Sequence, residues 1–323
     1  QRSALAMISS DSGQRLQNTV PSIMQTASTL RKSGEVIGMS LGDVVFDNMA
    51  IYPQYVQSLK NRNITFFQCI GNHDFEKAYA DLHNSSVGAE RYAEQMFGRY
   101  FGPVNYSFNI GNAHVVTIKS INYRGGCHYE EEITEEDLRW LERDLSYVQK
   151  DRLVILNMHA PGWNAMEPID NILNAKRLEE ILAPYDAHVF AGHTHFFENV
   201  EVSPRLYQHN IGSACGAWWT SNICRDGSPN GYMVVTVDGK KLRWKYRSAN
   251  SKSDVQMRVY KPGEFRTQKD FIVANVWEWD PHCRVVWYED GKYKGLMQRF
   301  VDNDEAFLRT KPRKHQLAKT GHL

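Results

Sequence analysis

The stretch "ITFFQCIGNHD" (64–74) joins an apolar run to a glycine and three polar residues. Its aromatic and β-branched content is typical of a buried strand, and Gly71 ends the run. Asn72, His73 and Asp74 follow directly, and in α/β sheets ligands bind beyond the carboxyl ends of strands. On its own "GNHD" could be a type I′ turn, although Asn-His-Asp is an unusual choice for one, so its meaning depends on how the other strands of the chain end.

Three further apolar runs end in polar residues of the same kinds. These residues are Asp43 in "SLGD" (40–43), His159 in "LNMH" (156–159), and His193 and His195 in "FAGHTH" (190–195). A single histidine after a buried strand is more often structural than a ligand, and a single Gly-Asp is more often a turn. Four such ends, separated by strand–helix units, favour one shared site. Carboxylate, amide and imidazole groups together suit divalent Mn, Fe, Zn or Ni.

The opening stretch "ALAMISSDSGQR" (4–15) repeats this pattern near the start of the chain. A strand-like run reaches Asp11, and Gly13 then breaks it. Asp-Ser-Gly is ordinary turn chemistry, in which Asp caps itself and glycine supplies positive φ. The later strand ends nevertheless make Asp11 a candidate first ligand of the site.

The order of strand and helix signals predicts the architecture. Strands and helices alternate through the first two-thirds of the chain, which indicates a layered α/β domain with helices outside. Residues 196–249 contain mainly strands, and residues 249–264 are expected to form a linker. Alternation around Asp290-Gly291 then predicts a small antiparallel β module, followed by a basic, helix-poor tail. We therefore expect a large domain at 1–249 and a small β module at 250–323.

Composition excludes some classes of partner. The 323 residues carry a formal net charge of +1, so no electrostatic case exists for nucleic acid or an anionic membrane as the main partner. No apolar run approaches the roughly 18–20 residues that span a bilayer. Residues 4–9 already read as a core strand, which suggests a processed or trimmed end from which an upstream signal or domain could be missing. The five cysteines lack zinc-finger spacing, although Cys215 and Cys224 could pair across a loop.

Taken together, the motifs resemble those of the calcineurin-like metallophosphoesterases. The signature of that family runs D-x-H, G-D-x-x-D, G-N-H-[DE], a lone His, and G-H-x-H. The matching stretches here are "DSG" (11–13), "GDVVFD" (42–47), "GNHD" (71–74), "MHAPGW" (158–163) and "GHTH" (192–195). The resemblance covers roughly residues 4–249. The remainder is similar to a C-terminal β module of bacterial, exported members, which implies a periplasmic or secreted protein and leaves a cytoplasmic one open.

The resemblance implies a β-sheet sandwich flanked by helices and a centre of two divalent metal ions. Asp43 would bridge the two metals, with Asn72, His159 and His193 completing the shell of one. Asp11 and His195 would hold the other.

In the same comparison, His73 would lie near the scissile phosphate, with Asp74 orienting its imidazole. Two departures stand out. The family's first histidine is replaced by Gly13, and the spacing within "GDVVFD" is one residue longer than usual, which puts an outer role for Asp47 in doubt.

Two functions follow from these residues. The first is hydrolysis of a small soluble, lipid-linked or sugar-linked phosphoester by a metal-bridging hydroxide, with His73 assisting the leaving group; manganese is one suitable metal. Whether the ester is a monoester or a diester stays open. The second is an inactive protein of the same fold that binds a glycan or cell-envelope ligand. The intact later motifs favour the hydrolase, whereas Gly13 favours the binding protein.

Four residues are candidates for substrate binding, each with a plainer alternative. Trp218 and Trp219 could stack on a sugar or base, or could pack in a core. Trp163 has the same two interpretations, and Arg124 could bind a phosphate or be an exposed structural arginine. The remaining histidines, which include His83, His114, His128, His188, His209 and His282, are expected to be structural.

Overall fold

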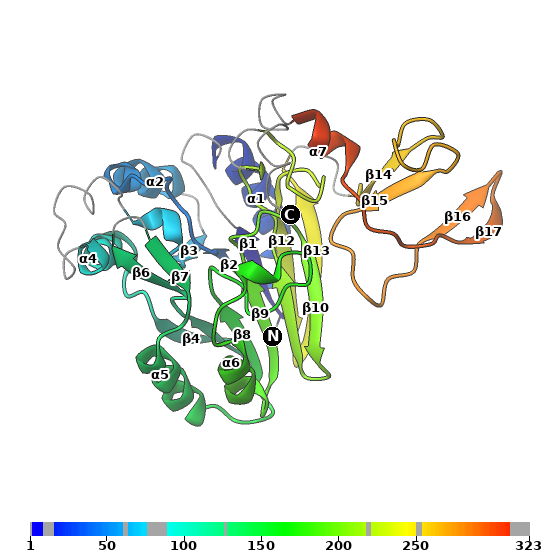
Figure 1. Ribbon diagram of the computed structural model, residues 1–323. Coiled ribbons are helices and arrows are strands. Elements are labelled where there is room, and N and C mark those ends of the chain that lie inside the picture. The colour runs from blue at the N-terminus through cyan, green and yellow to red at the C-terminus, as the bar shows by residue number, and fades with distance from the viewer. Residues whose placement is uncertain are drawn as a thin grey trace.

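The computed structural model describes residues 2–8, 16–60, 64–75, 89–125, 128–217, 221–249 and 254–310 (Figure 1). Four residues of the predicted site, Asp11, Gly13, Trp218 and Trp219, lie outside these ranges, so their roles stay predictions.

Two mixed sheets form the body of the protein. The five-stranded sheet contains, in spatial order, β13 (Lys241–Ser248), β12 (Gly231–Asp238), β1 (Arg2–Ile8), β2 (Gly34–Ser40) and β3 (Thr65–Gln68). The six-stranded sheet contains β10 (Glu198–Ser203), β11 (Leu206–Asn210), β9 (Asp186–Ala191), β8 (Leu153–Asn157), β5 (Ala113–Thr117) and β4 (Tyr106–Ile110). Strands β1, β2 and β3 are parallel, as are β5, β8, β9 and β11. The layered α/β prediction is confirmed.

The core between the two sheets explains the sandwich. Met39 and Val235 of the five-stranded sheet share a buried cluster with Val115, Ile155 and Phe190 of the six-stranded sheet. Because side chains alternate along a strand, the neighbours of the last three point away from this core. Those neighbours, which include Val116, Val154, Leu156 and Val189, form a second cluster with the helices. The six-stranded sheet is therefore covered on both faces.

Helices cover the outside of the sandwich. They are α1 (Leu16–Leu30), α2 (Tyr52–Leu59), α4 (Ala89–Phe101), α5 (Glu135–Ser146) and α6 (Ala175–Leu182), with short 3-10 helices η1 (Met49–Ile51), η2 (Asn72–Asp74) and η3 (Pro168–Asp170). The hydroxyl of Thr134 accepts a hydrogen bond from the N–H of Asp137 at 3.2 Å, which confirms the predicted N-cap of α5. Leu138, Leu141 and Leu145 are buried on one face of this helix, as its apolar spacing requires.

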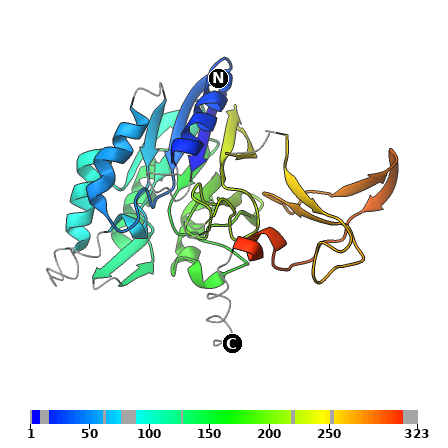
Figure 2. The same ribbon diagram turned by 90° about the horizontal axis from the view of Figure 1, so that it is seen from above.

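Short strand pairs complete the described structure. They are β6 (Ile121–Gly125) with β7 (His128–Glu131), β14 (Met257–Tyr260) with β15 (Val273–Val276), and β16 (Val286–Glu289) with β17 (Lys292–Leu296), and the last helix is α7 (Glu305–Thr310). Figures 1 and 2 show the C-terminal strands (orange) on the opposite side of the molecule from helix α4 (cyan).

Three predictions for the C-terminal part can be compared with these elements. The turn at Asp290-Gly291 is confirmed, because both residues have positive φ and join β16 to β17. The predicted linker at 249–264 is wrong in part, since β14 lies within it and pairs with β15. The tail is predicted to be helix-poor, and its described part contains one short helix, α7, which begins at Glu305 and buries Phe307.

The described cysteines and helices settle two further points. Cys215 and Cys224 are both buried free thiols, so the disulfide considered between them is not formed. Among the described residues, none of the helices has the length and apolar character needed to cross a membrane.

Candidate metal centre

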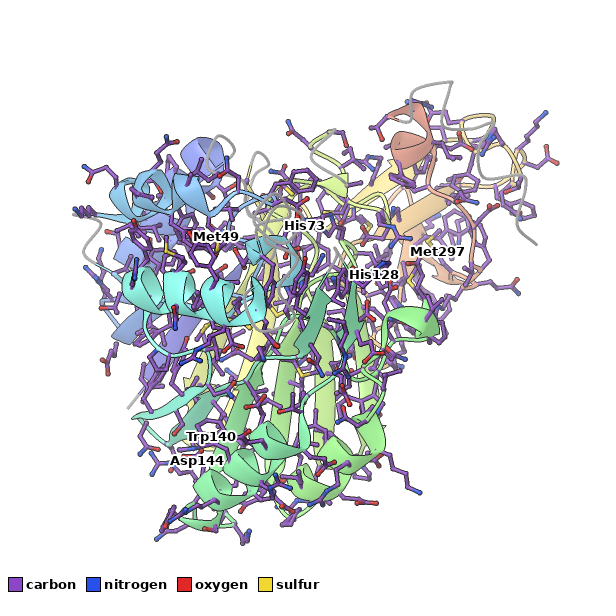
Figure 3. The ribbon with its side chains drawn as sticks, turned by 60° about the vertical axis from the view of Figure 1, so that its left-hand side comes forward. Met49, His73, His128, Trp140, Asp144 and Met297 are labelled. Atoms are coloured by element: carbon purple, nitrogen blue, oxygen red, sulfur yellow. The ribbon has the colours of Figure 1, made fainter. Side chains whose placement is uncertain are left out.

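The predicted site residues lie at the ends of four strands drawn from both sheets. Asp43 follows β2 and Asn72 follows β3 in one sheet, while His159 follows β8 and His193 follows β9 in the other. The two sheets therefore bring their carboxyl ends together at one end of the sandwich. Figure 3 shows His73 at this end of the molecule and Trp140 and Asp144 of α5 at the opposite end.

Nε2 of His159 is the point on which three other groups converge. It lies 2.9 Å from Oδ1 of Asn72, 3.2 Å from Nδ1 of His193 and 3.3 Å from Oδ2 of Asp43. Ligand atoms of Asp43, His159 and His193 lie within 4.8 Å of one another. The structure thus brings together four of the six metal ligands that the sequence predicted.

The hydrogen bonds around this point show that the group fits a cation. Nδ1 of His159 lies 2.7 Å from the carbonyl oxygen of Leu41, and since a carbonyl only accepts, Nδ1 donates to it. In the neutral ring Nε2 is then an acceptor, and it faces a carboxylate and an amide oxygen that are acceptors too. A bound cation satisfies all of them at once, with a backbone carbonyl fixing the ring as second-sphere groups do at known metal sites.

His195 has the hydrogen bonding that a ligand of a second cation would need. Its Nδ1 donates to the carbonyl oxygen of Gly216 at 3.0 Å, and this leaves Nε2 as an acceptor. The ring is almost fully buried, and burial lowers its pKa to about 4, so it stays neutral as a ligand must. The predicted partner Asp11 lies outside the described residues.

Opposite charges dominate the electrostatics of the first cluster. Burial works to raise the pKa of Asp43, but His159, His73 and His193 together hold it well below its usual range. Burial works to lower the pKa of His159, yet the charge of Asp43 raises it overall. Asp43 is therefore a permanent carboxylate at the centre of the site.

The backbone carries unusual conformations at the same positions. Asp43, Asp47, His193 and His195 have φ values of 54°, 53°, 65° and 58°, in the left-handed region that non-glycine residues seldom adopt. Strain of this kind concentrates at functional sites. Glycine at two nearby positions leaves the space that His159 and Asp43 occupy, because a Cβ there would clash with their side chains. A Cβ on Gly42 would lie 2.5 Å from Nδ1 of His159, and one on Gly71 would lie 2.3 Å from Oδ1 of Asp43.

His73 lies beside the cluster and faces a different carboxylate from the one predicted. Its backbone N–H donates to Oδ1 of Asp43 at 2.9 Å, and its ring Nδ1 lies 2.9 Å from Oδ1 of Asp47. Burial works to lower the pKa of His73, but the hydrogen bond to Asp47 raises it overall. Asp47 therefore orients this imidazole and favours its protonated form.

Asp74 has a structural place instead, which corrects its predicted contact with the His73 ring. Its Oδ2 accepts from the N–H of Gly71 at 2.8 Å, and its Oδ1 accepts from the N–H of Val45 at 3.3 Å. The carboxylate thus joins the "GNHD" and "GDVVFD" loops to each other. Burial, helped by the nearby charge of Asp43, raises the pKa of Asp74 to about 7. The extra residue within "GDVVFD" carries the chain to Asp47, whose left-handed backbone turns its carboxylate to His73.

Two of the substrate-binding candidates lie within the described residues. The guanidinium of Arg124 is exposed and already paired with Glu130 at 2.7 Å and Glu132 at 3.0 Å, which favours its structural interpretation. Trp163 is half-buried and packs against the larger apolar cluster, while Gln208 accepts from its N–H at 3.2 Å. Its role in binding substrate stays a prediction.

One carboxylate near the site was missed by the sequence analysis. Oε1 of Glu131 lies 3.3 Å from Nε2 of His193, and Asp170 of η3 shares a second potential ligand group with these two residues. Glu131 stands in a run of three glutamates that reads as a solvated surface, so only its tertiary position reveals it.

Comparisons with known proteins agree with this geometry. The sequence model described as "Calcineurin-like phosphoesterase" matches residues 19–197, and the one described as "C terminal of Calcineurin-like phosphoesterase" matches residues 208–322. A dimetal phosphatase from Danio rerio is similar in fold, with 12% identity over 85% of this chain and 98% of its own, and a TM-score of 0.51.

A second solved structure has the same fold. It is GAP50, the anchor in the inner membrane complex of Plasmodium, with 16% identity over 79% of this chain and 87% of its own, and a TM-score of 0.55. The comparison with curated proteins found no match.

Proposed function

Since the chain belongs to the calcineurin-like phosphoesterase family, we propose that it is a hydrolase that cleaves a phosphoester with two divalent metal ions. The observation that carries the proposal is the convergence of Asp43, Asn72 and His193 on Nε2 of His159. Together these groups direct a carboxylate, an amide oxygen and two imidazole nitrogens at one point, and a phosphoester needs its negative charge neutralised by cations before it can be attacked.

The ligands divide into two shells. Asn72, His159 and His193 would hold one ion, His195 and Asp11 the other, and Asp43 would bridge them. When bound, the two ions supply charge neutralisation for the phosphoryl oxygens and activate water as the nucleophile at neutral pH. Mn, Fe, Zn and Ni all suit this mixture of nitrogen and oxygen donors.

His73 is the group that handles the leaving oxygen. Its Nδ1–H is held by Asp47 at 2.9 Å, and this contact favours the imidazolium form. Water adds to phosphorus and releases one proton to solvent, while the bond from phosphorus to the leaving oxygen breaks and the proton on Nε2 of His73 passes to that oxygen. A proton taken up from solvent then restores the imidazolium of His73. Asp47 stabilises the charged ring before the transfer and keeps its orientation.

Gly13 bears on how tightly the second ion is held. The histidine expected two residues after Asp11 would add an imidazole to that shell, and glycine offers no ligand. The second ion would then depend on Asp11, His195 and Asp43, a set richer in oxygen that favours harder cations such as Mn²⁺.

Turnover assays test the proposal directly. The chain is freed of metal and incubated with Mn²⁺, Fe²⁺, Zn²⁺ or Ni²⁺ and a chromogenic phosphate monoester or diester. We expect metal-dependent release of the chromogen from at least one ester. Metal binding without turnover of either ester would contradict the hydrolase and support the alternative, a binding protein built on this fold for a glycan or cell-envelope ligand.

A further inference from the structure

Three consecutive glutamates at the end of β7 point in alternate directions. The carboxylates of Glu130 and Glu132 both contact Nη2 of Arg124, at 2.7 Å and 3.0 Å. Glu131 lies between them, and its Oε1 is 3.3 Å from Nε2 of His193. This is the two-residue alternation of a strand. One face of the run is an exposed ion-pair network, and the other reaches the metal centre.

The two nitrogens of His193 face different groups. Its Nδ1 is 3.2 Å from Nε2 of His159, within the ligand cluster, while its Nε2 faces Glu131. A carboxylate only accepts, so the neutral ring carries its proton on Nε2 and keeps its lone pair on Nδ1. Both side chains are largely shielded, with His193 11% and Glu131 22% exposed, so water competes little for this contact.

Each candidate histidine ligand has an acceptor behind it, but only one of these acceptors is charged. His159 is backed by the carbonyl of Leu41 and His195 by that of Gly216. Behind a metal-bound imidazole, a carboxylate fixes the tautomer and raises the basicity of the ligating nitrogen. We propose that Glu131 is a positioning residue of the metal centre, which holds His193 so that Nδ1 faces the bound ion and strengthens that bond.

The backbone around Glu131 holds its carboxylate in place. Its carbonyl oxygen accepts from the N–H of Leu173 at 2.8 Å, and the next residue, Glu132, donates its N–H to the carbonyl of Ser120 at 3.1 Å. The hydroxyl of Ser120 in turn accepts from the N–H of His159 at 3.0 Å. Hairpin β6–β7 is thus anchored to the same strand end that carries a ligand.

The inference rests on the metal centre of the proposed function, and metal affinity tests it without any assay of turnover. Apo protein is titrated calorimetrically with Mn²⁺ and with Zn²⁺, using the wild type, Glu131→Ala, Glu131→Gln and the matched control Glu130→Gln. We expect Glu131→Ala to weaken binding by about 10- to 100-fold at unchanged stoichiometry. Glu131→Gln should lose less, because its amide oxygen still accepts from Nε2–H. Glu130→Gln should bind as the wild type does.

Two results would overturn the inference. One is wild-type affinity in Glu131→Ala, which would show that the carboxylate does not support His193. The other is the loss of a whole metal equivalent, which would make Glu131 a ligand itself together with Asp170.

Thermal unfolding of each apo variant in chelator verifies that the compared proteins are folded. The hydrolase proposal fails separately, if the wild type binds metal and cleaves no ester.

Discussion

Two pairs of histidines in the six-stranded half of the protein show what separates a candidate metal ligand from a structural residue. His159 and His193 lie beyond the ends of β8 and β9, with ring centroids 5.0 Å apart, and they share the carboxylate of Asp43. His188 and His209 lie within β9 and β11 and stack with centroids 5.2 Å apart and planes 4° from parallel.

The hydrogen bonds of the second pair are confined to neutral groups. Nδ1 of His188 lies 2.9 Å from Nε2 of His209, and Nδ1 of His209 lies 2.7 Å from Oδ1 of Asn199. Burial lowers the pKa of His188 to about 4 and that of His209 well below its usual range. In the first pair the charge of Asp43 reverses this direction at His159. A buried carboxylate beside the rings distinguishes the candidate ligand pair. Neither the burial of a ring nor the short distance between the two rings does so.

The largest effect is expected from breaking the ligand pair. Removing the imidazole in His159→Ala should eliminate one metal equivalent and lower turnover by about 1000-fold or more, because the bound ions stabilise the transition state by several kcal/mol. Metal analysis and steady-state kinetics measure both. His188→Gln is the matched control, and it should keep the full metal content. Loss of metal in His188→Gln as well would contradict the division into a ligand pair and a structural pair.

His73 should differ from both histidine pairs, because its removal should lower turnover and leave the metal content unchanged. His73→Ala is expected to lower kcat by about 100- to 10,000-fold, the range for removal of a general acid, and to keep its metal. Steady-state kinetics and metal analysis on the same preparation measure kcat and metal content together. An equal loss of metal would instead make His73 a ligand.

The two aspartates near His73 are expected to have different roles, Asp47 in turnover and Asp74 in stability. Asp47→Asn should lower kcat by about 10-fold, since the ring loses the carboxylate that holds its proton, while the melting temperature stays close to that of the wild type. Asp74→Asn should lower the melting temperature and leave kcat close to that of the wild type, because Asp74 joins two loops through Gly71 and Val45. If Asp74→Asn instead lowered kcat without loss of stability, the original prediction of Asp74 as the orienting residue would be restored.

The last effect does not involve turnover and concerns stability at low pH. The folded-state pKa of His188 is lowered to about 4, so the unfolded chain binds a proton first as the pH falls. The stabilising contribution of the neutral His188 is therefore fully present above about pH 6.5 and is lost between there and about pH 4, a change of about 3 kcal/mol. Denaturant unfolding of apo protein at pH 7 and pH 4.5 should show a smaller decrease for His188→Gln than for the wild type. Equal decreases in the two proteins would contradict the conclusion that His188 is held neutral in the folded state.

Local signals predicted much of this structure. The ends of β2, β3, β8 and β9 were found from apolar runs that stop at glycine or a polar residue. The N-cap at Thr134 and the turn at Asp290-Gly291 follow from residue chemistry that acts within a few positions.

The parts that could not be predicted depend on tertiary placement. Asp47 was doubted because of spacing, yet a left-handed backbone at that residue turns its carboxylate to His73. Glu131 stands among other glutamates, and only the packing of β6–β7 against the strand ends brings it to His193. Strand β14 is only four residues long and lies in an otherwise polar stretch, so its pairing with β15 gave little local signal.

The most direct test of the account is a crystal structure of the chain grown with Mn²⁺, with anomalous diffraction measured to locate the metal. The account predicts an anomalous peak bonded to Nε2 of His159, Nδ1 of His193, Oδ1 of Asn72 and the carboxylate of Asp43, and a second peak beside Nε2 of His195. An empty cluster with a direct hydrogen bond between His159 and Asn72 would contradict it.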